Sequence, residues 1–315
     1  MTDISPSSEI VNSGFISILG RPNAGKSTLL NRLSSMHLAI VSPKPQTTRH
    51  AIRCIVDDDT SQIVFVDTPG LHKPDSKLGE KMQESAWKAL GDADAVLLMI
   101  DAERPGPSVL EREVCSRCAA YGKELFLAVN KADKVPKPSL LPIIARYAAL
   151  HPFQAIIPIS ARTGDGVDVL LDELRKTLPM GPRYFPRDTL TDQTERVLAA
   201  ELIRESALRE LKEEVPHGVG VLVERFEELR NGEPAGEDDR DRVSIGAVLY
   251  CEKETHKGIL IGKGGSMLKK IGTNARTRIE EMTGCPVYLE LLVKVREDWR
   301  NRKGILADLG YGEEK

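Results

Sequence analysis

The sequence lacks a long hydrophobic run, a basic leader segment and a paired set of cysteines. Its longest uninterrupted apolar stretch, residues 95–100, is far shorter than the roughly 20 residues of a transmembrane helix. The first ten residues hold acids and serines but no basic region before an apolar stretch, so we expect no signal peptide. The five cysteines are odd in number and scattered, which argues against a secreted disulfide framework. We therefore expect a soluble, cytoplasmic protein.

Length and charge indicate a two-domain chain with an uneven surface. The 315 residues, 41% hydrophobic and 29% charged, are enough for about two folded domains. Residues 192–241 carry 15 acidic and 7 basic side chains, a balance of −8, whereas residues 253–303 carry 12 basic and 6 acidic ones, a balance of +6. The basic segment is compatible with a polyanionic partner, although charge alone favours an ordinary solvated surface.

Up to about residue 180, short apolar runs alternate with longer amphipathic stretches. Buried strands are predicted at 15–19, 63–66, 95–100, 125–129 and 156–159. Helices are predicted at 26–35, 77–90, 108–121, 140–149 and 167–178. This alternation predicts an α/β domain with a doubly wound, mostly parallel sheet, whose ligand lies at the carboxyl ends of the strands.

The pattern changes after residues 179–186, which contain three prolines and a glycine and are interpreted as a linker. Beyond them the sequence predicts a helix at about 193–214, a strand at 219–223, an acidic loop at 230–241 and a second strand at 243–251. Two helices that flank a glycine turn near 262–265 and a last strand at 287–295 follow. This α-β-β-α-α-β order predicts a second, α+β domain. The chain is therefore divided into a tail (1–13), the α/β domain (14–179), a linker (180–191), the α+β domain (192–298) and a C-terminal tail (299–315).

The strongest motif is Gly-Arg-Pro-Asn-Ala-Gly-Lys-Ser at residues 20–27, which matches the phosphate-binding pattern G-x-x-x-x-G-K-[ST] between a predicted strand and helix. Gly20 and Gly25 let the backbone turn its N–H groups toward phosphate oxygens, and the helix N-terminus adds a positive dipole end. Lys26 can reach the outer phosphates, and the Ser27 hydroxyl can ligate Mg²⁺. The alternative, an incidental glycine turn, does not explain the flanking strand and helix.

Asp67-Thr-Pro-Gly70 follows the next predicted strand. There the Asp67 carboxylate can hold Mg²⁺ through water, and the Gly70 N–H can reach a γ-phosphate. In Ras-type enzymes the next residue is a glutamine that orients the attacking water. Here it is Leu71, which cannot form a side-chain hydrogen bond, so we expect slow intrinsic hydrolysis unless a partner completes the site.

Two further motifs, Asn130-Lys-Ala-Asp133 and Ser160-Ala161, are predicted to select guanine. In Asn130-Lys-Ala-Asp133 the Asp133 carboxylate can accept the N1–H and N2–H of guanine, a contact that adenine cannot make. Asn130 and Lys131 would brace the base and the phosphate loop, and the Ala161 N–H can reach guanine O6. The candidate nucleotide-binding residues are Gly20, Arg21, Pro22, Asn23, Ala24, Gly25, Lys26, Ser27, Thr28, Asp67, Thr68, Pro69, Gly70, Leu71, Asn130, Lys131, Asp133, Ser160, Ala161 and Arg162.

These ordered motifs resemble a translation-factor-type GTPase domain. Together with Gln-Thr-Thr-Arg-His at residues 46–50 and the second domain, they resemble the Era-like bacterial GTPases of the TrmE-Era-EngA type over residues 14–312. The resemblance implies that switch I comprises Gln46, Thr47, Thr48, Arg49 and His50. It implies that Thr48, in preference to Thr47, joins Ser27 and Asp67 at Mg²⁺, although a polar surface loop is the plain alternative.

The resemblance also agrees with a hydrophobic residue at position 71, and it implies a role for Asn23. In related GTPases an asparagine here helps to hold K⁺ beside the phosphates; Asn23 is equally compatible with tying down its own loop. His72 could act as a general base, but its place beside Lys-Pro favours a loop residue.

Gly262-Lys263-Gly264-Gly265 is a G-x-x-G turn between two predicted helices. In a KH module such a turn clamps the backbone of about four single-stranded nucleotides. A plain helix–helix glycine turn is the alternative. The α-β-β-α-α-β order, which is that of a type II KH fold, favours RNA binding, as do basic residues on the following helix. The candidate RNA-binding residues are Gly262, Lys263, Gly264, Gly265, Lys269, Lys270 and Arg276, with Arg278 adding charge.

Other residues of this domain have two readings each. The apolar residues Ile259, Leu260, Ile261, Leu268 and Ile271 would line a base-binding groove, or belong to the core. Trp299 is interpreted as a cover of the KH core, with stacking on a base as the alternative.

In the first domain, Cys115-x-x-Cys118 lies in a predicted helix without a second Cys or His pair, so we expect no metal or redox site there.

The resemblance implies a GTP-hydrolysing switch that binds GTP and GDP with Mg²⁺, and in addition K⁺. It implies binding to the 3′ end of 16S ribosomal RNA, a role in assembly of the 30S subunit, a monomeric state and peripheral association with the cytoplasmic face of the cell membrane. Two other classes stay open. One is an RNA-binding assembly factor with a structural nucleotide site. The other is a membrane-surface GTPase whose basic domain binds anionic lipid, which the G-x-x-G turn disfavours.

Overall fold

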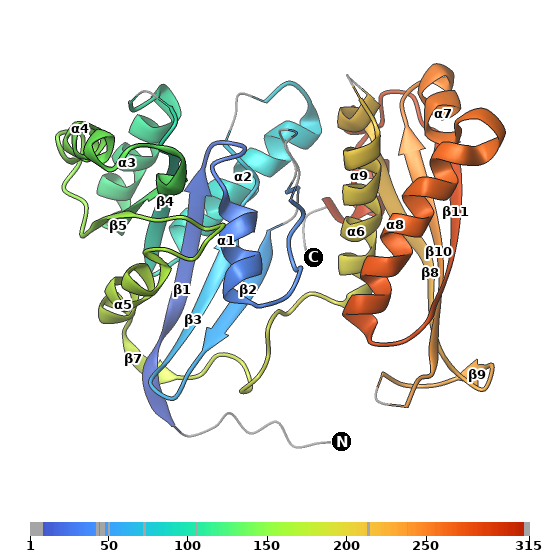
Figure 1. The fold of residues 1–315 in the computed structure, drawn as a ribbon, viewed down its shortest axis with the longest axis horizontal. Coiled ribbons are helices and arrows are strands. Elements are labelled where there is room, and N and C mark those ends of the chain that lie inside the picture. Colours follow the sequence, from blue (N-terminus) through green and yellow to red (C-terminus); the bar gives the residue numbers. More distant parts are fainter. Residues whose placement is uncertain are drawn as a thin grey trace. The chain divides into compact units, whose positions relative to one another are not determined.

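The computed structural model describes residues 9–41, 44, 48–49, 51–71, 74–104, 106–212, 215–237 and 239–311. They form two compact units, the first within residues 1–73 and 82–192 and the second within 74–81 and 193–315. Figure 1 shows both units and labels most of their helices and strands. Among the described residues, no helix is long and apolar enough to cross a membrane.

The first unit is built on a seven-stranded sheet in the order β2-β3-β1-β4-β5-β6, with β7 paired to β1. Its strands are β1 (Ile10–Gly20), β2 (Ile52–Asp57), β3 (Ser61–Asp67), β4 (Ala95–Asp101), β5 (Glu124–Asn130), β6 (Ile156–Pro158) and β7 (Met180–Pro182). β2 runs antiparallel to β3, and β7 antiparallel to β1, whereas the other pairs are parallel. The predicted doubly wound, mostly parallel sheet is confirmed. The two antiparallel strands were not predicted, because neither has a clear apolar periodicity.

Helices cover this sheet because its strands are apolar on both sides; every residue of β4 before Asp101 is buried. The helices are α1 (Lys26–Leu33), α2 (Lys77–Asp92), α3 (Val109–Tyr121), α4 (Lys137–Ala148) and α5 (Val167–Thr177), with a short 3₁₀ turn, η1 (Ala132–Lys134). One core joins the β1, β4 and β5 side chains Leu19, Leu98 and Val129 to residues of α2, α3 and α4. Ile18, one residue before Leu19 on β1, is also fully buried, and it faces the opposite side because strand side chains alternate.

Residues 180–191, predicted as a linker, are hydrogen-bonded to the first unit. The side chain of Gln62, on β3, is fully buried. It donates to the Phe185 carbonyl over 2.9 Å and accepts the N–H groups of Tyr184 and Phe185 over 2.8 and 3.0 Å. The buried guanidinium of Arg183 forms an ion pair with β2. The prolines interrupt the periodic pattern of this segment, yet the segment is held in place. The reason is that the buried side-chain amide of Gln62 takes its hydrogen-bond partners from it.

The second unit has a four-stranded sheet in the order β11-β10-β8-β9, in which β10 pairs in parallel with β11 and antiparallel with β8. Its main elements are α6 (Glu195–Glu210), β8 (Gly220–Arg230), β9 (Glu233–Pro234), β10 (Arg242–Cys251), α7 (Glu254–Ile261), α8 (Ser266–Thr283) and β11 (Val287–Val295). Short turns are η2 (Val215–Gly218), η3 (Lys263–Gly265), η4 (Trp299–Asn301), α9 (Lys303–Leu306) and η5 (Ala307–Tyr311). The predicted α-β-β-α-α-β order is confirmed.

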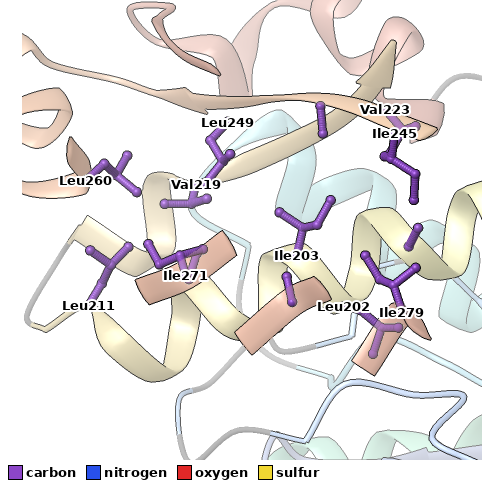
Figure 2. Close-up of a cluster of buried hydrophobic side chains, with 14 of the residues drawn as sticks. Leu202, Ile203, Leu211, Val219, Val223, Ile245, Leu249, Leu260, Ile271 and Ile279 are labelled. Carbon is purple, nitrogen blue, oxygen red and sulfur yellow. The ribbon is translucent and has the colours of Figure 1, made fainter. Parts of the chain in front are cut away.

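One apolar core holds this second unit together. Side chains of α6, α7 and α8, among them Ile203, Leu260 and Ile271, pack against Ile245 and Leu249 of β10 (Figure 2). Helical side chains three or four positions apart share a face, so α6 and α8 each present an apolar stripe to this core, to which α7 adds Leu260. Burial of such side chains stabilises the unit by roughly 1.5–3 kcal/mol each.

The length of β8 differs from the prediction, and the position of Trp299 decides between its two interpretations. β8 continues past the predicted 219–223 to Arg230, where Asn231 and Gly232, both at positive φ, turn it into β9 within the predicted acidic loop. Trp299 is fully buried, and its indole N–H donates to the Gly218 carbonyl over 2.8 Å. The indole is therefore a structural group, and base stacking by Trp299 is excluded.

Candidate functional site

The phosphate loop runs from the end of β1 to the first turn of α1. Its two glycines are required by close packing. A Cβ at Gly20 would lie 2.4 Å from the Met99 carbonyl oxygen, and one at Gly25 would lie 2.1 Å from the Asn130 side-chain nitrogen. Asn23 is exposed at the tip of the loop with a left-handed φ of 64°, a conformation that asparagine tolerates better than most residues.

Lys26 is the buried cation of the loop. Its ammonium donates to the Gly20 and Arg21 carbonyls over 3.3 and 3.5 Å, and the residue is only 6% exposed. Burial lowers the pKa of Lys26, and the charge of Asp67 opposes that shift. A buried cation is costly unless an anion compensates it, so this position favours a polyphosphate ligand. Thr28 follows, half-buried, in the same helical turn.

Three oxygen-bearing side chains converge beside Lys26. The Ser27 and Thr48 hydroxyl oxygens lie 3.0 Å apart, and each hydroxyl donates to Asp67 Oδ2 over 3.2 Å. Asp67 Oδ1 is buried and has no hydrogen-bond partner among the described residues. Burial raises the pKa of Asp67 to about 6, against the lowering effect of Lys26 and the two hydroxyls. Hydroxyl and carboxylate oxygens are the ligands that Mg²⁺ prefers, so these residues fit such an ion.

The residues after Asp67 pack against the loop rather than reaching outward. The Thr68 hydroxyl donates to the Ile18 carbonyl over 2.8 Å, so this side chain holds the strand ends together. Pro69 and Gly70 are buried, and a Cβ at Gly70 would lie 2.9 Å from the Pro22 nitrogen. Leu71 is 2% exposed and packs in the core of the first unit. Its side chain therefore cannot orient a water molecule.

Asn130 connects three loops. Its side-chain nitrogen donates to the Ala24 carbonyl over 2.7 Å, and its side-chain oxygen accepts the Ala161 N–H over 2.9 Å. Because Ala161 donates to Asn130, its predicted contact with guanine O6 would have to be shared. Asn130 itself is 2% exposed, so it positions the phosphate loop and the loop after β6 relative to each other.

The predicted base-binding carboxylate is accessible. The Asp133 side chain is 17% exposed, and Arg162, whose side chain is 72% exposed, donates to it over 2.7 Å. The Ser160 hydroxyl first, and Arg162 second, lower the pKa of Asp133, so the carboxylate is ionised at neutral pH. Lys131, with φ 63°, donates to Asp101 on β4 over 2.6 Å, which fixes its side chain at the end of that strand.

Several positioning residues were missed by sequence reasoning. Asn31 of α1 exchanges two 2.7 Å hydrogen bonds with the backbone of Ala39, before switch I. Arg32 donates to the Ala161 and Arg162 carbonyls. Glu111, in the first turn of α3, faces Arg21 of the phosphate loop at 3.8 Å. Asn31 and Arg32 belong to a helix whose pattern shows only an ordinary amphipathic segment. Ser108-x-x-Glu111 is a capping box, a local signal that marks the start of α3 but not the contact with Arg21.

Part of switch I lies outside the described residues. Thr48 and Arg49 are described and buried, whereas the predictions for Gln46, Thr47, His50 and His72 fall on residues that the structure does not describe.

The G-x-x-G turn of the second unit lies between α7 and α8. Gly262, Gly264 and Gly265 have φ values of 72°, 58° and 79°. A Cβ at Gly262 would lie 2.7 Å from the Met267 Cβ, whereas nothing lies within 4 Å of a Cβ at Gly264 or Gly265. Lys263 and Gly264 are exposed. The turn therefore presents open backbone next to a cation, as close approach of a phosphate chain requires.

A groove of about 310 Å³ lies beside this turn, between α8 and β11. Its lining combines apolar and basic side chains: Gly265, Leu268, Lys269, Gly272, Thr273, Arg276, Leu289 and Leu291. Lys270 is not part of it, because its ammonium pairs with Glu210 of α6 over 2.6 Å. Adjacent residues on a helix point about 100° apart, which sends Lys269 and Lys270 to different faces. Arg278 likewise pairs with Glu205 of α6.

Of the predicted apolar groove residues, Leu268 lines the groove, whereas Leu260 and Ile271 are fully buried in the core. Ile259 is 48% exposed, and Ile261 is half-buried. Of the two readings given for Leu260 and Ile271, the core one therefore holds, because each side chain faces the interior from its own helix, α7 or α8.

The cysteine pair on α3 lies in the interior of the first unit. Cys115 and Cys118 are buried, and burial raises their thiol pKa values to about 11 and 12. Among the described residues, no group of three His, Cys, Asp or Glu side chains could hold a metal ion by itself.

Comparison with known proteins agrees with this arrangement. The family model described as "50S ribosome-binding GTPase" matches residues 15–131, and the "KH domain" model matches residues 214–300. The chain is 46% identical to GTPase Era of Ruminiclostridium cellulolyticum over 303 residues, which is 96% of this chain and 98% of that protein. It is 47% identical to GTPase Era of Geobacter metallireducens over 300 residues, or 95% and 97% of the two chains.

Two solved structures are similar over nearly the whole chain. One is a tyrosine-to-alanine variant of Aquifex aeolicus Era bound to GDP and AlF₄⁻, with a TM-score of 0.89, 38% identity and coverage of 96% of this chain and 100% of that one. The other is Era in complex with MgGDPNP and nucleotides 1506–1542 of 16S ribosomal RNA, with a TM-score of 0.89, 38% identity and coverage of 96% and 99%.

Proposed function

Because this chain belongs to the GTPase Era family, we propose that it is a GTP-hydrolysing switch that binds the 3′ end of 16S ribosomal RNA and assists assembly of the small ribosomal subunit. The observation that carries the proposal is the pairing of two sites on one chain. One unit holds a phosphate loop with the guanine-selecting Asp133, and the other holds a G-x-x-G turn beside a groove with Lys269 and Arg276.

In the first site, the loop N–H groups and Lys26 bind the phosphates, and Ser27, Thr48 and Asp67 would hold Mg²⁺. A relative in this family has been solved with MgGDPNP. When bound, the ion neutralises charge on the β- and γ-phosphates. The Gly70 N–H, three residues after β3 ends at Asp67, can bind a γ-phosphate. Loss of that phosphate would remove the partner of the Gly70 N–H and one ligand of the ion that Thr48 would help to hold, which is how the site would act as a switch.

The side chain at position 71 cannot orient the attacking water, so in this proposal another group must do so. Leu71 is buried and apolar, so intrinsic hydrolysis is slow in this proposal, and a bound ribosomal particle is the source of acceleration. We include K⁺ as a second ion beside the phosphates, because Asn23 stands exposed at the loop tip.

The K⁺ proposal predicts that hydrolysis runs roughly tenfold faster in KCl than in NaCl at equal ionic strength, a barrier difference of about 1.4 kcal/mol. Equal ionic strength separates the ion from general screening. Asn23→Gly removes the side chain but keeps the positive φ of 64° without strain, so this variant should hydrolyse GTP at the same rate in both salts. Equal rates for the unmodified protein would end the K⁺ proposal and leave the phosphate loop unaffected.

In the second site, the groove between α8 and β11 offers apolar surface for bases, and the G-x-x-G turn faces the RNA backbone. KH modules clamp about four nucleotides in this way. In a related Era structure, nucleotides 1506–1542 of 16S ribosomal RNA are present, which supports the same class of ligand here. We propose further that the protein acts as a cytoplasmic monomer with peripheral association at the inner membrane surface, on the family resemblance alone.

The proposed function is tested by GTP hydrolysis with and without small ribosomal subunits, and by titration of an RNA with the 16S 3′-end sequence. We expect slow turnover alone, stimulation of at least roughly tenfold by the subunits, and RNA binding that weakens with salt. Unstimulated hydrolysis with intact RNA binding would instead indicate an assembly factor with a structural nucleotide site. Binding to anionic vesicles in preference to the RNA would favour a membrane-surface GTPase.

A further inference from the structure

Arg32 links the phosphate site to the loop that follows β6. It lies in the last turn of α1, and its guanidinium donates to the Ala161 carbonyl over 2.8 Å and to the Arg162 carbonyl over 2.5 Å. The loop closes around this cation. The Gly164 N–H returns to the Ser160 carbonyl over 2.8 Å, and a Cβ at Gly164 would lie 2.8 Å from an Arg32 nitrogen.

The direction of these carbonyls fixes the N–H groups of the loop. Peptide units are planar and trans, so the N–H of each residue points opposite to the carbonyl before it, and the described residues contain no cis peptide bond. With the Ala161 carbonyl held by Arg32, the Arg162 N–H must point away from the guanidinium. Among the described residues it has no acceptor, whereas the Ala161 N–H donates to Asn130.

We propose that Arg32 is a positioning residue for guanine recognition, which orients the Arg162 N–H as a donor to guanine O6 and keeps the loop at a fixed place beside Asp133. This inference rests on the proposed GTPase function. The Arg162 N–H is thus a donor for guanine O6 that, unlike the Ala161 N–H, is not already bonded to Asn130.

The position of Arg32 on α1 supports this role. The helix begins with Lys26 and Ser27 at the phosphate site and ends near Arg32. Arg32 is six positions after Lys26, so at 1.5 Å per residue the two lie about 9 Å apart along the helix axis. One rigid helix therefore sets the distance between phosphate binding and base binding. A forked guanidinium donates to two neighbouring carbonyls from two nitrogens held in one rigid plane, whereas a lysine ammonium acts as a point charge and imposes no such plane.

The test compares Arg32→Ala and Arg32→Lys with the unmodified protein by calorimetric titration with GDP, ADP and tripolyphosphate in the presence of Mg²⁺. We expect Arg32→Ala to bind GDP at least roughly tenfold more weakly while its affinity for tripolyphosphate stays within about twofold. Arg32→Lys should recover part of the GDP affinity because it keeps a cationic donor near these carbonyls without the planar fork. Arg146→Ala, in the exposed last turn of α4, is the matched control and should leave both affinities unchanged.

Two outcomes would overturn the inference. Equal loss of GDP and tripolyphosphate affinity would mean that Arg32 only supports the fold of α1, and unchanged GDP affinity would mean that the loop needs no such support. The unmodified protein tests the proposed function separately. If it does not prefer GDP to ADP, guanine recognition itself is absent, whatever the Arg32 variants do.

Discussion

Asp133→Asn should weaken GTP binding by roughly 10³-fold or more and give the protein a new affinity for xanthosine triphosphate. The Asp133 carboxylate can only accept hydrogen bonds, which matches the N1–H and N2–H donors of guanine. An asparagine amide donates from one of the two positions, and xanthine carries a carbonyl where guanine carries the amino group. Sites built to hydrogen-bond one group reject its replacement by large factors, because buried polar atoms are left unpaired. Competitive binding of the two nucleotides measures the change.

Asp165→Asn is the matched control, because it makes the same carboxylate-to-amide change at an exposed position of the neighbouring loop. It should keep the preference for GTP. If Asp133→Asn also binds GTP as tightly as the unmodified protein does, Asp133 is not the residue that selects guanine.

The second large effect concerns the KH turn. Lys263→Asp combined with Gly264→Asp should reduce binding of the 16S 3′-end RNA by roughly 100-fold or more, with GTP affinity nearly unchanged. The two carboxylates would face RNA phosphates, and like charges repel. Gly264 accepts the change because nothing lies within 4 Å of an added Cβ and its φ of 58° is tolerated by aspartate. Gly262 is unsuitable, since a Cβ there would lie 2.7 Å from the Met267 Cβ.

A charge-matched control is available on α2. Lys88→Asp with Gly91→Asp adds the same negative charge at an exposed lysine and at a glycine whose added Cβ would meet nothing within 4 Å. Fluorescence titration with labelled RNA should separate the two variants. Were the turn variant to bind the RNA as the control does, the RNA site would lie elsewhere on the chain.

The sequence by itself determined the ligand class of the first unit and the order of elements in both units. The phosphate loop could be identified because its function depends on local backbone geometry, which Gly20 and Gly25 encode within eight residues. Asp67 and Asp133 could be placed because each follows an apolar run whose end marks the edge of a parallel sheet. The G-x-x-G turn was likewise visible, since positive φ at Gly262 and Gly264 is a local property.

Only the tertiary structure decided which side chains act together across long separations. Arg32 and Ala161 are 129 positions apart, and Gln62 and Phe185 are 123 apart, so no pattern in either segment shows the contact. Lys269 and Lys270 are neighbours with the same chemistry, yet the first lines the groove and the second pairs with α6. The physical reason is that periodicity specifies which face of an element is apolar. Which polar groups meet depends on strand order and helix packing, and these are set by the whole fold.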